Sequence, residues 1–259
     1  MSKPVIVLVP GAWHRPQHLR KVISGLEKSG YEAHGVALVS VDSNPPVTSW
    51  DKDAEAVREV IVKNLDADKD VIVIAHSYGG LVMSEAVKGL GKKARGEQGL
   101  KTGVLRLIYM CAIAPRKGET LQDKTKPGTE HEAKLAEQQM QTMKIEPDGM
   151  MLPTNRELGK KLLYNRCSPE DIEEALDLVG AFPVGPLLVP ATYTAYLEIP
   201  STYIVTENDM ALAPTAQERM VAEGEGAFDV IRCQEGHSPY LSNPGLIVDI
   251  IRRAAGEDV

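Results

Sequence analysis

Short runs of consecutive apolar residues recur along the chain, and the segments between them carry apolar residues at helical spacing. The first run, residues 5–9, contains only valine, isoleucine and leucine and stops at Pro10 and Gly11. A continuous apolar run of this length is typical of a strand buried on both faces. The same reasoning predicts further strands over residues 31–40, 71–74, 104–110, 202–206 and 228–232. The pattern therefore predicts about six core strands.

The segments between these runs are predicted to be helices. Residues 16–28 place Leu19, Val22 and Leu26 on one helical face, and Gly30 follows where a glycine commonly ends a helix. Further helices are predicted over residues 54–65, 81–87, 215–222 and 245–254. Strands that alternate with helices imply right-handed crossovers and a doubly wound, mostly parallel sheet. We therefore predict a single α/β domain over residues 1–259.

The middle of the chain, residues 117–199, has no strong strand run but several helix candidates, over residues 130–143, 155–163 and 168–179. The last begins with Ser168 as an N-cap, followed by proline and two acids. We expect residues 117–199 to form a helical cap above the carboxyl edge of the sheet, where open α/β sheets bind ligands. Candidate pocket residues in it are Met140, Met143 and Phe182, although these side chains could equally pack on the core.

Charge and cysteine content narrow the function. The chain has 259 residues, 43% of them hydrophobic, and a net charge of -7. An acidic surface disfavours nucleic acids and anionic membranes as partners. The three cysteines form no paired motif, so neither a disulfide framework nor a metal site is indicated. The first apolar run is too short for a signal peptide, and we expect a cytoplasmic protein.

Residues 75–80, with sequence AHSYGG, interrupt the pattern where the strand over residues 71–74 gives way to a helix. Small residues on both sides of Ser77 permit the close strand-to-helix turn of a nucleophile elbow, with Ala75 and Gly79 next to the strained serine. An ordinary turn with a capping serine is the alternative. The neighbouring His76 cannot reach back toward Ser77 as a base, and we expect a structural role for it.

A serine nucleophile needs a base and an acid that orients the base. His237 follows the predicted strand over residues 228–232, and Asp209 follows the strand over residues 202–206. The carboxyl ends of parallel strands share one edge of the sheet, so we predict a Ser77, Asp209 and His237 triad. Glu207 is the alternative acid.

Two backbone N–H groups are needed to hold the negative oxygen that forms during attack. We expect them from Tyr78, directly after the nucleophile, and from Ala12 in the loop after the first strand, with Trp13 as the alternative to Ala12. Gly11 allows close backbone approach in that loop. Trp13 and His14 are expected to face the substrate.

Residues 10–14 (PGAWH), residues 75–80, Asp209 and residues 236–239 (GHSP) together resemble the α/β-hydrolase superfamily. The likeness covers essentially the whole chain and is strongest to plant methyl esterases, hydroxynitrile lyases and related fungal and bacterial hydrolases. It implies a serine hydrolase with no metal or organic cofactor. Hydroxynitrile lyases carry threonine and lysine at positions that look like Gly11 and Ser238, so lyase activity is disfavoured.

The leading functional hypothesis is hydrolysis of a carboxylic ester or lactone of a small, largely apolar molecule. The first alternative is C–C bond hydrolysis or a secondary-metabolite tailoring step on the same triad. A second alternative, from a different class, is a small-molecule receptor with little turnover.

Overall fold

The computed structural model describes residues 3–259, and its central sheet has six parallel strands in the order β2-β1-β3-β4-β8-β9. These are β1 (Val5–Val9), β2 (Ala33–Gly35), β3 (Val71–His76), β4 (Val104–Met110), β8 (Ser201–Thr206) and β9 (Phe228–Cys233). The chain passes from β1 to β2 on one side and then to β3 on the other. The strand order thus reverses between β1 and β3, where ligands bind in doubly wound sheets. The predicted fold class is confirmed.

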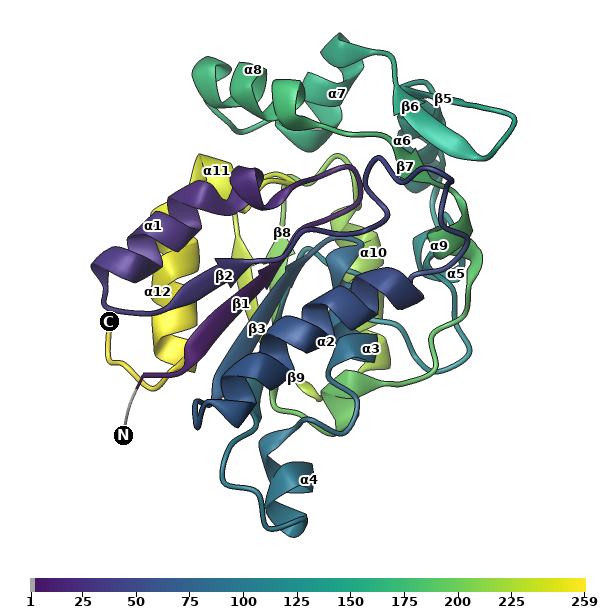
Figure 1. Cartoon of the computed structure of the whole chain (residues 1–259). Helices are drawn as coiled ribbons and strands as arrows, with labels where there is room; N and C mark the ends of the chain where they lie inside the picture. Colours follow the sequence, from purple (N-terminus) through teal and green to yellow (C-terminus); the bar gives the residue numbers. More distant parts are fainter. Residues whose placement is uncertain (1–2) are drawn as a thin grey trace.

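Helices cover both faces of this sheet (Figure 1). Side chains alternate along β1: Val5 and Val7 pack into one apolar cluster, and Ile6 and Leu8 pack into the other. The first cluster lies under α2 (Asp51–Asp66), α3 (Gly79–Ala86) and α10 (Pro214–Glu223), and the second lies under α1 (Arg20–Lys28) and α12 (Pro244–Ala254). Shorter helices are η1 (Pro16–Leu19), α4 (Lys92–Glu97) and α11 (Pro239–Ser242). Burial on both faces explains why β1 and residues 71–75 of β3 are apolar throughout.

The strand predicted over residues 31–40 is much shorter than expected, because only β2 pairs with the sheet. β2 is an edge strand whose sole neighbour is β1. Beyond it the chain makes one more backbone hydrogen bond, from Val36 N to Leu8 O, and then leaves the sheet. Val36 and Leu38 are apolar because they enter the core from a loop.

Residues 117–199 connect β4 to β8, and most of their elements lie as a separate layer above the carboxyl ends of the strands (Figure 1). Their helices are α5 (Leu121–Thr125), α6 (Glu130–Met140), α7 (Arg156–Leu163), α8 (Pro169–Leu178), α9 (Gly185–Leu188) and η2 (Ala195–Leu197). Ser168 accepts a hydrogen bond from Asp171 N at 3.2 Å, which confirms the predicted N-cap of α8.

A small antiparallel sheet in this segment was not predicted. It consists of β5 (Met143–Ile145), β6 (Met150–Pro153) and β7 (Phe182–Pro183). Strands of two to four residues are too short to show a period of two in the sequence. β7 lies about thirty residues from β6 along the chain, so its pairing depends on the folded cap.

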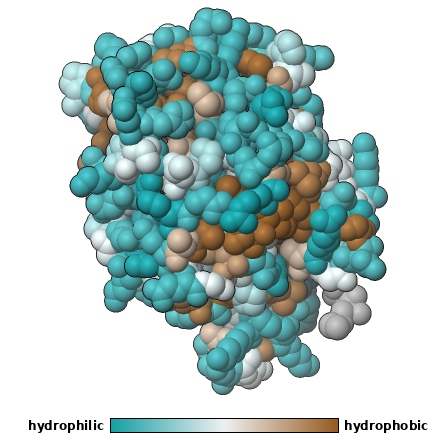
Figure 2. Space-filling model, turned by 180° about the vertical axis from the view of Figure 1, so that it is seen from behind, coloured by the Kyte–Doolittle hydropathy of each residue, from teal (hydrophilic) through white to brown (hydrophobic). Residues whose placement is uncertain are grey.

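The face opposite to the view of Figure 1 is mostly hydrophilic, with a continuous apolar area below the cap layer (Figure 2). Apolar atoms contribute a large part of any folded protein's surface, so this area alone indicates no partner. Over residues 3–259, none of the helices has the length and apolar character of a membrane span.

Gly80 marks a tight approach between α3 and the segment that follows β4. A Cβ at Gly80 would overlap Ile113 O and lie 3.0 Å from the Ala112 Cβ. We therefore expect Gly80→Ala to lower the free energy of unfolding by about 2–4 kcal/mol through overpacking against backbone.

Gly96 provides the matched control for this substitution, because it also lies in a helix, α4, and has open space around the Cβ position. Gly96→Ala should raise stability by up to about 1 kcal/mol through helix propensity. Chemical denaturation measures both variants. Equal stability of Gly80→Ala and wild type would contradict the close approach.

Candidate active site

The three residues predicted as a triad lie together at the carboxyl edge of the sheet. Ser77 follows β3, Asp209 follows β8, and His237 follows β9. His237 Nε2 is 3.2 Å from Ser77 Oγ, and His237 Nδ1 is 2.8 Å from Asp209 Oδ2. His237 and Asp209 are almost fully buried, whereas Ser77 is partly exposed. This arrangement can move a proton from the serine hydroxyl to the imidazole.

The turn that carries Ser77 is strained, as expected for a nucleophile elbow. Its φ angle is 53°, in the left-handed region that L-residues seldom occupy. A Cβ at Gly79 would lie 2.5 Å from Pro10 O, so only glycine lets α3 begin this close to β1. Ser77 N donates to Met110 O and Ser77 O accepts from Ile113 N, which holds the strained residue against the end of β4.

The carboxylate of Asp209 is fully engaged. Its Oδ1 accepts hydrogen bonds from the backbone N–H groups of Ala211 and Leu212, both at 2.8 Å. Its Oδ2 accepts from Thr206 Oγ1 and from Gln217 Nε2, both at 3.0 Å, in addition to His237. These donors fix the carboxylate so that one oxygen faces the imidazole.

Gln217 and Thr206 were missed by sequence reasoning. Gln217 lies on the buried face of α10 together with Ala216 and Met220. A polar side chain among apolar ones on a buried helix face indicates a buried hydrogen-bond partner, and this pattern is visible in the sequence. Glu207, the alternative acid, is exposed and accepts a hydrogen bond from the Gln234 side chain. It makes no contact with His237, so the alternative is wrong.

Three backbone N–H groups, at the elbow and in the loop after β1, have no protein acceptor among residues 3–259. Within residues 3–259, the N–H groups of Ala12 and Tyr78 donate to no protein atom, and the same holds for Trp13. A Cβ at Gly11 would lie 3.0 Å from the Ser77 Cβ, so the loop after β1 lies directly against the nucleophile. Free donors beside a nucleophile can bind a negatively charged oxygen.

The loop after β1 is also bound to the cap. Gly180 N donates to Trp13 O at 2.9 Å, and the Trp13 ring packs on Phe182 with centroids 5.6 Å apart. Phe182 also contacts the Tyr78 ring, at 5.0 Å, while the Tyr78 hydroxyl donates to buried Asp53 at 2.7 Å. The cap therefore touches both segments that carry the free N–H groups.

Two of the predicted substrate-facing residues are buried and contact other protein groups. His14 is 2% exposed, and its ring nitrogens contact Ala12 O and the Tyr164 hydroxyl. Phe182 is fully buried between Trp13 and Tyr78. These contacts make both side chains part of the support of the loop and the elbow, and a contact of either with substrate stays a prediction.

The remaining candidates for substrate contact differ in their exposure. Trp13 is partly exposed. Met143 is partly buried and packs against the core, and Met140 is 55% exposed at the end of α6. Roles for Trp13, Met140 and Met143 in substrate binding stay predictions.

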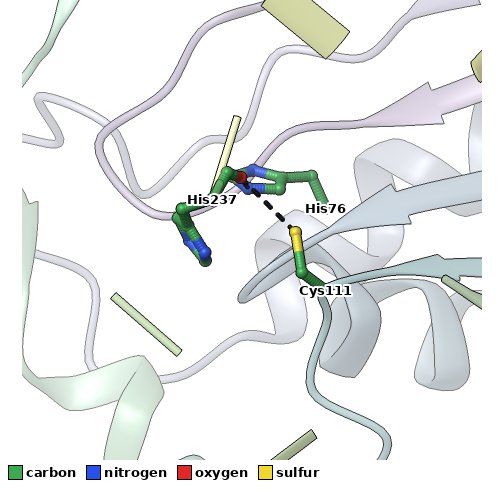
Figure 3. A group of neighbouring side chains, drawn as sticks. All are labelled: His76, Cys111 and His237. Atoms are coloured by element: carbon green, nitrogen blue, oxygen red, sulfur yellow. Dashed lines mark hydrogen bonds between the residues drawn. The ribbon is translucent and has the colours of Figure 1, made fainter. Parts of the chain in front are cut away.

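His76, Cys111 and His237 each place one potential metal-binding atom within 4.8 Å of the others (Figure 3). Hydrogen bonds occupy most of these atoms otherwise, and only Nδ1 of His76 lacks a partner among the described residues. His76 Nε2 lies 2.8 Å from His237 O and Cys111 Sγ lies 3.4 Å from the same oxygen, while the His237 ring contacts Ser77 and Asp209. Burial raises the pKa of the Cys111 thiol well above its ordinary value, which disfavours the thiolate that a metal requires. We interpret the group as a hydrogen-bonded cluster.

Three buried histidines make stability depend on pH. Burial is the largest cause that lowers the pKa of His14 and His76 well below the ordinary value, and it also lowers the pKa of His18. Below about pH 6.5 the unfolded chain takes up protons that the folded chain does not, so the free energy of unfolding decreases as pH falls. Each group contributes up to about 1.4 kcal/mol per pH unit in that window.

We therefore expect the free energy of unfolding to fall between about pH 7 and about pH 5. His18→Gln should reduce this slope, and the exposed His131 supplies the control, because His131→Gln should leave it unchanged. Denaturant titrations at several pH values measure the slope. A slope that His18→Gln and His131→Gln change equally would contradict the assignment.

The chain is similar to a known protein family, to known sequences and to solved structures. The model of the alpha/beta hydrolase family matches residues 6–250. The chain is 43% identical to the alpha/beta hydrolase nvfD of Aspergillus novofumigatus, over 100% of this chain and 99% of that protein. It is 25% identical to methylesterase 18 of Arabidopsis thaliana, over 98% of each chain. A pyrethroid hydrolase from Sphingobium faniae has the same fold, with a TM-score of 0.81 and 21% identity over 98% of each chain.

Proposed function

The chain belongs to the alpha/beta hydrolase family of hydrolytic enzymes, and we propose that it cleaves a carboxylic ester or lactone through an acyl-enzyme on Ser77. The observation that carries the proposal is the continuous hydrogen-bonded path from Ser77 Oγ through His237 to Asp209, with distances of 3.2 Å and 2.8 Å. An imidazole between a serine and a buried carboxylate is the arrangement that activates serine for acyl transfer.

In the proposed first step, Ser77 Oγ attacks the carbonyl carbon of the substrate and its proton passes to His237 Nε2. The carbonyl oxygen becomes negative and accepts hydrogen bonds from the N–H groups of Ala12 and Tyr78. The carbon–oxygen bond to the alcohol then breaks, and His237 returns the proton to the departing oxygen. Ser77 now carries the acyl group as an ester.

In the second step, His237 removes a proton from water, which attacks the acyl-enzyme carbonyl. The bond to Ser77 Oγ breaks, the serine recovers its proton from His237, and the acid leaves. Asp209 holds the Nδ1–H of His237 throughout and stabilises the imidazolium form. This sequence uses only protein groups and water.

We further propose that residues 117–199 act as the cap that selects the substrate. Their contacts with Trp13 and Tyr78 place this segment beside the proposed acyl site. Ester chemistry is favoured by the similarity to methylesterase 18. The Met143 side chain and the ring of Trp13 are partly buried apolar groups suited to a small, largely apolar molecule.

Labelling by a fluorophosphonate probe tests the proposal. The folded protein should become covalently modified, and peptide mapping by mass spectrometry should locate the phosphonyl group on Ser77. A panel of p-nitrophenyl esters, methyl esters and lactones, tested beside a diketone, should then reveal ester or lactone turnover that the bound probe abolishes. Absence of labelling, or tight binding of the panel compounds without product, would overturn the proposal and favour a receptor. Labelling with turnover only of a diketone would favour C–C bond hydrolysis.

A further inference from the structure

His76 occupies the last position of β3, directly before Ser77, and its side chain lies in the buried centre of the site. It is 1% exposed. Its ring packs against the rings of His237 and Tyr240, with centroids 4.6 Å and 4.9 Å away. Since the residue cannot reach Ser77 as a base, its chemistry lies in what these ring atoms contact.

One ring nitrogen of His76 holds the main chain of His237. Nε2 lies 2.8 Å from the carbonyl oxygen of His237. A carbonyl oxygen only accepts hydrogen bonds, so Nε2 carries the proton and donates it. Burial lowers the pKa of His76 well below the ordinary value, so the ring is neutral and Nδ1 carries a lone pair.

The Nδ1 atom has no hydrogen-bond partner in the part of the chain that the structure describes, although it is buried. A buried acceptor without a partner costs free energy, and an apolar side chain at this position would avoid that cost. The benefit of a histidine here therefore lies in the Nε2–H bond to His237.

The same ring also contacts the loop that carries Ala12. A Cβ at Gly11 would lie 2.9 Å from His76 Nδ1 and 3.2 Å from its Cε1. The edge of the imidazole therefore rests on the Cα of Gly11, and the absence of a side chain there permits the contact. One side chain thus touches the segments of the nucleophile, the base and the free N–H groups.

A second donor reaches the same carbonyl oxygen. Cys111 Sγ lies 3.4 Å from His237 O, and Figure 3 draws this hydrogen bond beside the ring of His76. Burial keeps the Cys111 thiol protonated by raising its pKa, so it can donate. The carbonyl of His237 is thus fixed from β3 and from the end of β4.

We propose that His76 is the positioning residue of the catalytic base: its Nε2–H bond to the His237 carbonyl sets the place of the imidazole relative to Ser77. This inference rests on the proposed serine hydrolysis. A base displaced by about 1 Å can lose about 10²-fold in rate, so the bond acts on catalysis without contact to the substrate.

Two variants of His76 separate the hydrogen bond from the filling of space. In glutamine the amide nitrogen lies as many bonds from Cγ as Nε2 does in histidine, so His76→Gln can keep the donor. In His76→Asn the amide is one bond shorter and corresponds to the Nδ1 position, so it loses the bond to His237. Both variants place an amide in the same buried site.

We expect His76→Asn to lower kcat for p-nitrophenyl acetate by roughly 10- to 100-fold with little change in KM, and to slow fluorophosphonate labelling of Ser77 equally. His76→Gln should recover most of both rates. Thermal unfolding identifies variants that have lost the fold. Folded Asn and Gln variants with equal kcat, or a folded Asn variant with the wild-type labelling rate, would overturn the inference.

A measurement on the wild-type protein tests the same bond without turnover. In ¹⁵N-histidine-labelled protein, the NMR shifts of His76 should be those of a neutral ring protonated at Nε2, with Nδ1 unprotonated. A ring protonated at Nδ1 would overturn the inference even if the protein hydrolyses esters. Failure of the wild-type protein to react with fluorophosphonate would instead overturn the proposed function, so the two failures are distinguishable.

Discussion

Replacing Ser77 by alanine is expected to lower kcat for ester hydrolysis by about 10⁵- to 10⁶-fold, the largest effect of any single substitution in this chain. Ser77 Oγ is the one protein atom in the proposed mechanism that forms a bond to the carbonyl carbon of the substrate. Without it, the remaining acceleration would come from the free N–H groups and from binding alone.

The fold should survive this change. The backbone of Ser77 is held by hydrogen bonds to Met110 and Ile113, and its hydroxyl contacts only His237 among the described residues. Alanine can occupy the same φ of 53° at a cost similar to that for serine. We expect the free energy of unfolding to change by less than about 1 kcal/mol.

Ser84→Ala is the matched control. Ser84 lies on α3, is fully buried, and hydrogen-bonds Gly80 O and the Tyr109 hydroxyl. Its loss leaves the buried Tyr109 hydroxyl without a partner, which should cost about 1–3 kcal/mol of stability. Ser84→Ala should therefore keep its esterase activity but have a lower free energy of unfolding. Ser77→Ala should lose its activity but keep the wild-type free energy of unfolding. Activity assays and denaturation curves measure the two quantities. Activity of Ser77→Ala within tenfold of wild type would refute Ser77 as the nucleophile.

The elements that converge on the site could be predicted because their signals are local. Buried parallel strands are apolar throughout, and a candidate residue directly after such a strand must lie at the carboxyl edge of the sheet. On this basis the sequence predicts that Ser77, Asp209 and His237 lie together. In the structure they lie within hydrogen-bonding distance. Gly79 was recognisable for the same reason, since a turn this tight has few alternatives.

The sequence analysis favours Asp209 over Glu207 as the acid, and the structure gives the physical reason. Both residues follow β8 within three positions, so the position in the sequence is compatible with a contact between the base and either carboxylate. The turn in which Asp209 N donates to Thr206 O directs Asp209 inward, while Glu207 N donates to Cys233 O and its side chain lies outside. Turn geometry of this kind depends on tertiary packing more than on residue type.

The residues around the pocket were the least predictable. An apolar or aromatic residue in a loop or cap can serve equally as support or as lining, and only the packing of separate segments decides between them. Phe182 is support because the cap places β7 over Trp13 and Tyr78. The contact between His76 and the His237 carbonyl spans 161 residues, which no local pattern can report.

Asp209→Asn is expected to lower kcat by about 10⁴-fold, because the amide would impose the wrong protonation state on the base. Oδ1 of Asp209 accepts from two backbone N–H groups, so the asparagine oxygen must take that place. Its NH₂ group then faces His237 Nδ1 and donates to it. The proton of the neutral imidazole moves to Nε2, which can no longer accept the proton of Ser77.

Either orientation of the asparagine places donor against donor, but the orientation with NH₂ toward His237 does so at fewer backbone N–H groups. Gln217 Oε1 accepts from Thr206 N at 3.0 Å, which holds the Gln217 Nε2–H toward position 209 as a donor. With the asparagine NH₂ toward His237, that NH₂ also meets the Gln217 Nε2–H group, so donor faces donor at one contact. The opposite orientation would place the NH₂ against the N–H groups of both Ala211 and Leu212. We expect a stability loss of about 1–3 kcal/mol in addition to the loss of rate.

Glu207→Gln makes the same chemical change two residues earlier and is the control for Asp209→Asn. Glu207 is exposed and its carboxylate contacts Gln234, so we expect kcat and KM within about twofold of wild type. Steady-state kinetics on one p-nitrophenyl ester, with urea denaturation of each variant, compares the two. A large loss of kcat in Glu207→Gln together with near-normal kcat in Asp209→Asn would reverse the assignment of the acid. The reason is that only a carboxylate that accepts the Nδ1–H of His237 keeps Nε2 free to take the proton of Ser77.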